Sequence, residues 1–67
     1  MERGERLLNV MRRGHVTTSE IASNLNMNRS TFYRKIKDPR ASFTMEQVFK
    51  IKNLLSMSKD DFQAIFF

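Results

Sequence analysis

The sequence predicts an all-α protein, a compact bundle of five short helices in a single domain over residues 1–67. Three observations predict this class. Apolar residues recur at helical spacing, no segment alternates as a strand would, and the same helix-start pattern recurs in four places. A chain of this length buries only about 60% of the surface that its unfolded form exposes. We therefore expect a small core and no room for a large catalytic cleft.

Each predicted helix start has a Ser, Thr or Asn cap bracketed by two apolar residues, a hydrophobic staple. The caps are Thr17, Asn28, Thr44 and Ser58, and the apolar pairs are Val16 with Ile21, Met27 with Phe32, Phe43 with Val48, and Met57 with Phe62. Glu20 and Gln47 lie three residues after their caps, which predicts two capping boxes, and Asp61 after Ser58 is a weaker version. The expected helices span residues 2–13, 18–25, 29–37, 45–55 and 59–66.

Three residues predict where helices end. Gly14 and Asn26 are suited to the left-handed conformation that closes the first and second helices. Pro39 disfavours helical geometry at Asp38 and is expected to end the third helix.

Positive charge is concentrated in one part of the chain. The formal net charge is +5, and residues 28–40 carry five basic residues and one acidic residue, which gives 5 − 1 = +4. A basic solvated face with no function is the alternative reading. Clustering on one helix and its exit favours an anionic partner.

The segment TSEIASNLNMNRSTFYRKIK, residues 18–37, has the features of a two-helix DNA-reading unit. Such a unit needs a small residue where the helices cross, a left-handed residue in the turn and apolar residues that fix the second helix. In this order the sequence has Ala22, Asn26, and then Leu25, Met27, Phe32 and Ile36. The segment resembles the helix-turn-helix of the Cro and repressor family, the lambda-repressor-like phage regulators. Asn26 stands where that family usually has glycine, and the bulky Phe32 leaves open a tilt of the second helix.

The resemblance implies a sequence-specific transcriptional regulator whose second helix lies in the major groove of double-stranded operator DNA. By position it implies that base edges are faced by Arg29, Ser30, Tyr33 and Arg34, with Asn28 and Lys37 at the two ends of that surface. The chemistry agrees, because arginine can donate two parallel hydrogen bonds to guanine. For Tyr33, a partly buried surface aromatic is the alternative. The resemblance also implies action in the cytoplasm of a bacterial or phage-infected cell, at the nucleoid.

Contacts to the phosphate backbone of the DNA are expected to supply most of the binding affinity. The candidate phosphate-contacting residues are Thr18, Ser19, Lys35, Arg40, Ser42 and Thr44. Two alternatives are open for Arg12 and Arg13. They lie beside the DNA backbone, or they only offset the C-terminal dipole of the first helix.

Other functional classes lack the residues that they need. The chain has no cysteine, two distant glycines and a single histidine, His15, expected in an exposed turn. We therefore expect no enzyme, no cofactor and no metal site, and the absence of a long apolar run predicts no membrane span or secretory signal. A protein-binding modulator that acts with another regulator is the main alternative to DNA binding, and RNA is less favoured because its major groove is deep and narrow.

The C-terminal residues 64–67 raise the question of assembly. Phe62 and Ile65 can close the core, whereas Phe66 and Phe67 have no obvious partner within one small domain. We expect a homodimer whose interface includes Ile65, Phe66 and Phe67, and the alternative is that both rings fold back onto the first helix. A two-fold dimer would place two recognition helices about 34 Å apart and read a palindrome.

Overall fold

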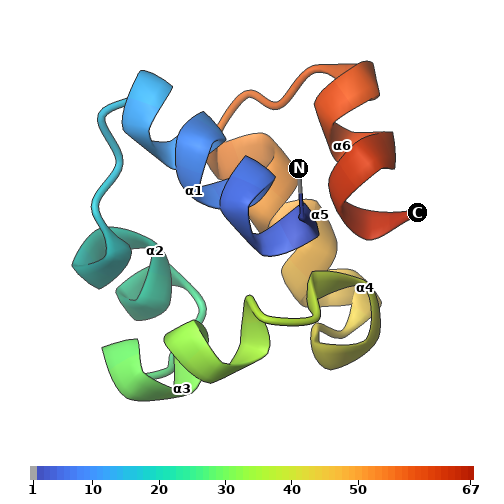
Figure 1. The fold of residues 1–67 in the computed structure, drawn as a ribbon. Helices are drawn as coiled ribbons and strands as arrows, with labels where there is room; N and C mark the ends of the chain where they lie inside the picture. The colour runs from blue at the N-terminus through green and yellow to red at the C-terminus, as the bar shows by residue number, and fades with distance from the viewer. Residues whose placement is uncertain (1) are drawn as a thin grey trace.

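Helices form all the secondary structure in the computed structural model, which describes residues 2–67 (Figure 1). They are α1 (Arg3–Arg13), α2 (Thr18–Asn24), α3 (Arg29–Lys35), α4 (Pro39–Ser42), α5 (Met45–Leu54) and α6 (Lys59–Phe66). The all-helical prediction is confirmed. The expected number of five helices is wrong, because the described residues contain a sixth helix, α4, between the third and fourth predicted ones.

The four predicted caps all form. Each cap side chain accepts a hydrogen bond from the backbone N–H three residues later, at 2.9–3.2 Å for Thr17, Asn28, Thr44 and Ser58. Only Thr44 and Gln47 complete a capping box, because the Gln47 side chain accepts from the Thr44 N–H at 3.0 Å. The prediction of a complete capping box at Thr17 is wrong. The Glu20 carboxylate accepts from the Thr17 hydroxyl at 3.2 Å and not from the Thr17 backbone N–H.

The left-handed conformation predicted at two helix ends occurs at Asn26 but not at Gly14. Asn26 has φ 57°, as predicted. The prediction for Gly14 is wrong: its φ is −87°, and His15 takes the left-handed conformation with φ 57°. The reason is that the Gly14 N–H still donates to Val10 O at 3.0 Å, so the helical turn continues through Gly14 and the chain reverses one residue later.

Pro39 lies after the end of α3 and is the first residue of α4. Asp38 has φ −140° and ψ 74°, so the residue before proline is not helical, as predicted. Proline also suits the first position of a helix, where its missing N–H has no partner to lose, and here it begins α4. The helix predicted over residues 29–37 therefore ends at Lys35, two residues early, and Lys37 lies in the connection to α4.

One apolar core joins the helices. The α1 helix packs mainly on α6, α2 contacts α3 and α5, and α4 contacts α1 and α6 (Figure 1). The core consists of Leu7, Val10, Met11, Ile21, Ala22, Leu25, Phe32, Ile36, Phe43, Val48, Ile51, Leu55, Met57, Ile65 and Phe66.

Phe66 has partners within the chain, so the expectation that it lacks them is wrong. Its ring is 5% exposed and lies 6.3 Å from the Phe43 ring and 5.6 Å from the Phe62 ring. The short α4 helix, which the sequence reading missed, brings Phe43 to this position. Phe67, in contrast, is 58% exposed and contacts Phe62 from outside the core.

No helix among residues 2–67 combines the length and the apolar character that crossing a bilayer requires.

Candidate nucleic-acid interface

Buried side chains of α2 and α3 hold these two helices against the core. Ala22, Leu25, Phe32 and Ile36 are buried, and Met27 is partly buried against the same core. The sequence predicted that these residues face the core, and their burial is confirmed. The Met27 N–H donates to Ala22 O at 3.0 Å, which closes the turn around left-handed Asn26.

The opposite face of α3 is open to solvent and carries the expected base-reading residues. Exposed side chains on or next to α3 are Asn28, Arg29, Ser30, Tyr33, Arg34 and Lys37. Within residues 2–67, the side chains of Arg29, Ser30 and Lys37 have no hydrogen-bond or ion-pair partner. Their donors are therefore free for a ligand. Asn28 uses its side-chain oxygen as the α3 cap and keeps only its amide NH₂ free for a ligand.

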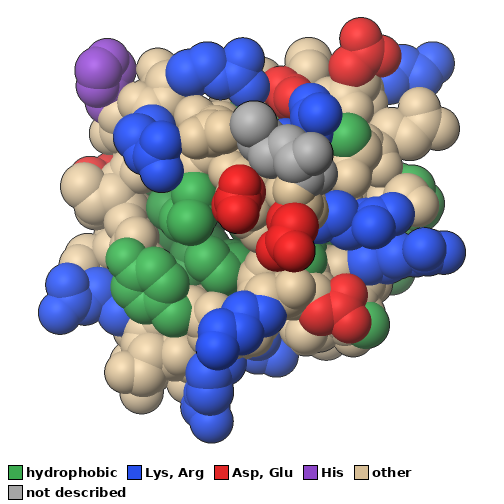
Figure 2. All heavy atoms as spheres, viewed as in Figure 1, with side chains coloured by type: hydrophobic (Ala, Val, Ile, Leu, Met, Phe, Trp, Pro, Cys, Tyr) green, Lys and Arg blue, Asp and Glu red, His purple; other side chains and the backbone are tan. Residues whose placement is uncertain are grey.

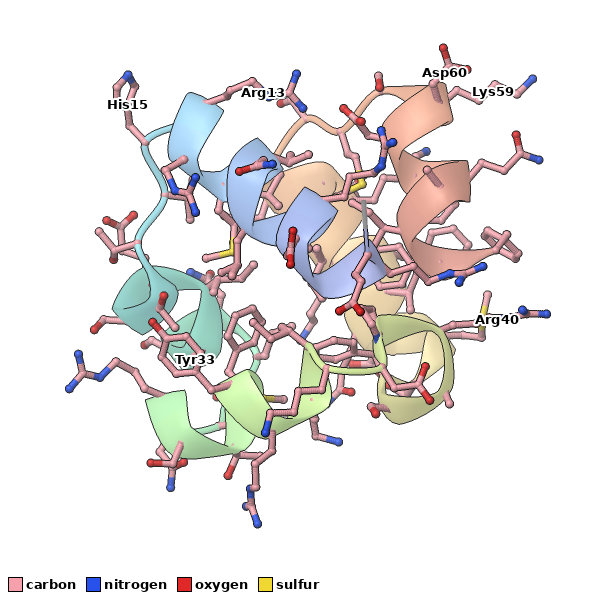
Figure 3. The ribbon with its side chains drawn as sticks, viewed as in Figure 1. Arg13, His15, Tyr33, Arg40, Lys59 and Asp60 are labelled. Atoms are coloured by element: carbon pink, nitrogen blue, oxygen red, sulfur yellow. The ribbon has the colours of Figure 1, made fainter. Side chains whose placement is uncertain are left out.

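Tyr33 joins α3 to α2. Its hydroxyl lies 3.2 Å from the Thr18 hydroxyl, and its ring meets the Phe32 ring edge-on at 6.5 Å. The side chain is 49% exposed, so about half of it remains open to solvent. Figure 3 shows Tyr33 between α2 and α3. Thr18 and Tyr33 border an open hollow that is also lined by Leu8, Met11, Arg12, His15, Val16 and Thr17.

A second hollow lies where α3 meets α4, lined by Thr31, Arg34, Lys35 and Ser42. The Arg34 guanidinium donates to Thr31 Oγ1 at 3.3 Å. The Lys35 ammonium donates to Ser42 O at 2.9 Å and lies 5.9 Å from the centre of the Phe43 ring. Two cations therefore converge on one hollow, and Lys35 also holds α4 against α3. The sequence reading missed Thr31, although its spacing of three residues before Arg34 was a usable signal.

The remaining phosphate candidates are more dispersed. Ser19 is exposed in the first turn of α2, beside half-buried Thr18. Thr44 is exposed, but its hydroxyl caps α5. Arg40 projects from α4 on the opposite side of the view from Tyr33 (Figure 3), so the structure does not bring it to the open face of α3.

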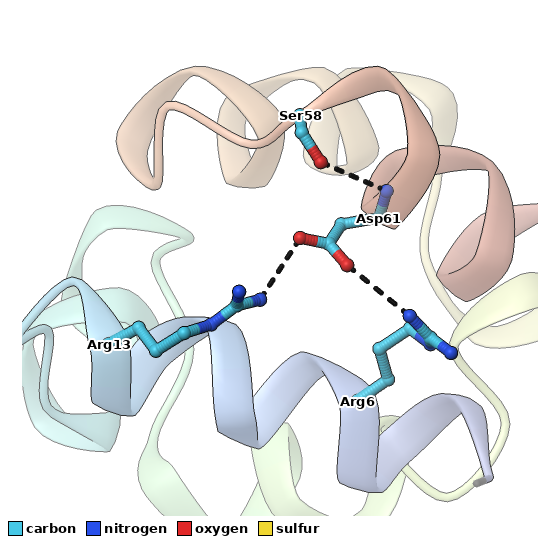
Figure 4. A network of polar contacts seen from close by, with 4 residues as sticks. All are labelled: Arg6, Arg13, Ser58 and Asp61. Atoms are coloured by element: carbon cyan, nitrogen blue, oxygen red, sulfur yellow. Dashed lines mark hydrogen bonds and ion pairs between the residues drawn. The ribbon is translucent and has the colours of Figure 1, made fainter.

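The basic residues of α1 serve a different contact. Arg13 and Arg6 both pair with Asp61 of α6, at 3.0 and 3.4 Å, and Ser58 accepts from the Asp61 N–H (Figure 4). Burial of Asp61 opposes ionisation, but hydrogen bonds involving Arg13, Ser58 and Arg6 outweigh it and lower the pKa of this carboxyl. Arg13 therefore holds α6 against α1, a contact that neither sequence reading included. Arg12 donates to Asn9 at 2.8 Å and remains exposed.

The charge that remains for a ligand is concentrated on α3 and its exit. Residues 21–37 contain no acidic residue and include Arg29, Arg34, Lys35 and Lys37. Figure 2 shows basic side chains along the lower edge of the molecule, where α3 lies in Figure 1, below an apolar patch. Such a surface attracts a polyanion. Among residues 2–67 there is no group of three His, Asp or Glu side chains placed to hold a metal ion.

Comparisons with known proteins give no relative: no protein-family model, no curated protein and no solved structure matches the chain.

Proposed function

We propose that this protein binds double-stranded DNA with α3 in the major groove and acts as a sequence-specific transcriptional regulator. In this proposal α2, the turn at Asn26 and α3 form a helix-turn-helix like that of the Cro and repressor family. The observation that carries the proposal is the exposed face of α3 and its exit. Arg29 and Ser30 on the helix and Lys37 just after it have free donors, and α3 itself carries no acidic residue.

The geometry supports base reading by the exposed face of α3. The cap at Asn28 and the buried Phe32 and Ile36 hold the helix in place, so its backbone needs little ordering on binding. Arg29 and Arg34 are the candidates for bidentate contact with guanine, and Ser30 can donate or accept. The exposed part of the Tyr33 ring is suited to contact with a thymine methyl, while its hydroxyl bond to Thr18 fixes its direction.

Phosphate contacts are supported best at the hollow between α3 and α4. Lys35 lines this hollow and can neutralise a backbone phosphate, with Thr31 as a further donor. Lys35 would then act on every sequence alike, because phosphates carry no base identity.

The test begins with selection of bound duplexes from a random pool at two salt concentrations. On the selected duplex, Arg29→Ala and Arg34→Ala should each cost about 1 to 3 kcal/mol, whereas Lys35→Ala should weaken selected and unrelated duplexes equally. Lys59→Ala is the matched control, because Lys59 starts α6 on the far side of the molecule from α3 (Figure 3). Arginine variants that bind the selected duplex as tightly as the parent at fixed salt would contradict the proposed surface.

A protein-binding modulator is the second candidate, favoured by one observation. The hollow beside Tyr33 has apolar Leu8, Met11 and Val16 in its lining, which could receive an apolar side chain of another regulator. Failure of the chain to bind any duplex at low salt would favour this candidate over DNA binding.

A further inference from the structure

A hollow on α1 is lined by arginines that the proposed DNA-binding surface does not include. Arg6, Asn9, Arg12 and Arg13 of α1 line it together with Asp61 of α6. Its volume is about 480 Å³, within the range of sites that hold small molecules. Arg13 lies near the top of the view in Figure 3, whereas α3 lies at the bottom of the same view in Figure 1. We call this site the arginine hollow.

The arginine hollow carries more positive than negative charge. Three arginines line it with one carboxylate, so its formal charge is 3 − 1 = +2. Within residues 2–67, Asp61 is the only acidic residue that lines it. The Asp61 side chain is 18% exposed, and each of its oxygens already contacts one arginine, so it is held on the inner side of the hollow. Two uncompensated positive charges therefore remain for a ligand.

Asp61 orients two of the guanidinium groups and leaves most of their donors open. Its Oδ1 lies 3.4 Å from Arg6 Nη1 and its Oδ2 lies 3.0 Å from Arg13 Nη2 (Figure 4). Arg12 donates through Nη1 to Asn9 Oδ1 at 2.8 Å. A guanidinium has five N–H donors, so each arginine keeps unpaired N–H groups within residues 2–67. The Arg6 and Arg13 side chains are 40% and 68% exposed, so a ligand can reach these donors.

We propose that the arginine hollow binds the doubly charged phosphate group of a small molecule, a phosphate monoester or a diphosphate. Arginine is well matched to this group, because its planar fork offers two parallel N–H donors to two phosphate oxygens. A phosphate monoester is close to a dianion at neutral pH and so matches the two uncompensated charges. A phosphodiester of the DNA backbone carries only one charge. Because Asp61 already holds Arg6 and Arg13 in place, little ordering is needed on binding. Such a site is separate from α3 and does not require DNA binding.

The experiment titrates the full chain with pyrophosphate at low salt, in a buffer free of phosphate and sulfate, and follows binding by isothermal titration calorimetry. The parent should bind pyrophosphate. Arg12→Gln and Arg13→Gln should each weaken that binding by about tenfold, the loss expected when a charge-assisted hydrogen bond is removed.

Two controls separate the arginine hollow from net charge and from misfolding. Arg29→Gln removes the same charge from an exposed arginine on α3, so it should leave pyrophosphate affinity unchanged. Arg13→Gln also breaks a contact between α1 and α6, so its helix content is measured by circular dichroism. Arg12 contacts Asn9 of its own helix, so Arg12→Gln tests the hollow without disturbing the contact between α1 and α6.

Dimethyl phosphate identifies the ligand class, because it is a singly charged diester like the DNA backbone. It should bind at least about tenfold more weakly than pyrophosphate, since it has less charge to pair with the arginines. Equal affinity for the two probes would overturn the assignment to a doubly charged phosphate.

Three further results overturn the proposal. They are no binding of pyrophosphate up to about 10 mM, unchanged binding in both hollow variants, and equal weakening by Arg29→Gln and the hollow variants. Weakening confined to Arg12→Gln and Arg13→Gln supports the proposal, whether or not the chain binds DNA. Failure of the proposed function would therefore leave the arginine hollow standing.

Discussion

Gly4 on α1 lies directly against the backbone carbonyl of Ile36, the C-cap residue of α3. A β-carbon at Gly4 would collide with that carbonyl, so glycine is what permits α1 to approach the end of α3 this closely. The contact holds the C-terminal end of α3 from behind while its other face stays open. In this way a residue at the start of the chain supports the proposed DNA-reading helix.

Gly4→Ala should therefore destabilise the protein by about 1 to 3 kcal/mol, because the added methyl meets backbone and cannot be accommodated by a flexible side chain. Gly14→Ala provides the opposite case. Gly14 has φ −87° and its added β-carbon would lie 3.5 Å from the nearest atom, so alanine should be neutral or stabilise by up to about 1 kcal/mol. Urea unfolding of both variants checks the pair. Equal effects from the two substitutions would contradict the close contact.

Ser56→Gly should stabilise the fold by about 0.5 to 1 kcal/mol. Ser56 ends the turn after α5 with φ 46°, a conformation that costs a residue with a side chain and costs glycine nothing. Asn26→Gly should gain less at φ 57°, because asparagine tolerates this region better than serine. Thermal unfolding under identical conditions ranks the two. A lower melting temperature for Ser56→Gly than for the parent would show that the left-handed turn is misassigned.

The ionised Asp61 carboxylate should make stability fall at low pH. Its pKa is lowered in the folded protein, so it binds protons more weakly than in the unfolded chain. The stabilisation is thus fully present above the ordinary carboxyl range, about pH 4, and is lost as pH falls through the lower folded value. Asp61→Asn should be less stable than the parent at neutral pH, and the difference should shrink on acidification.

The adjacent Asp60 is the control for this effect. It is exposed and has no ion-pair partner within residues 2–67, so Asp60→Asn should change stability little over the same range. Urea midpoints measured from about pH 7 to about pH 2 compare the two variants. If the difference in stability between the parent and Asp61→Asn widened on acidification, it would contradict a carboxylate that Arg6 and Arg13 stabilise in its ionised form.

Asn28 has separable roles in folding and in the proposed DNA contact. Asn28→Ala should cost about 1 kcal/mol in stability, because the bond from the Thr31 N–H at 2.9 Å is lost. Asn28→Asp should keep that cap and the stability but weaken DNA binding, since the negative charge that replaces the free amide would be repelled by the polyanionic DNA. Thermal unfolding and fluorescence anisotropy with a labelled duplex read out the two roles. Unchanged duplex affinity in Asn28→Asp would remove Asn28 from the interface.

Local signals in the sequence determined most helix starts and much of the core. Thr44 with Gln47, and the caps Asn28 and Ser58, act over three or four residues, so their patterns are legible without the rest of the chain. The same holds for the buried side of residues 18–37, where Ala22 and Phe32 recur at helical spacing. Even locally, signals compete. Glycine is typical of a left-handed helix end, yet the turn passes through Gly14 to His15, and Pro39 follows a non-helical Asp38 as predicted but also starts α4.

Only the tertiary structure decided which charged and aromatic side chains are already engaged. Residues far apart in the sequence meet at Asp61 with Arg6 and Arg13, and at Phe66 with Phe43. Lys35 likewise turned out to be held by Ser42, and Phe67 remained exposed while Phe66 did not. Composition sets how much charge and apolar surface the chain has. Packing between distant elements decides how much of the charge and apolar surface stays exposed. A side chain that already contacts a neighbour within the fold is not available to a binding partner.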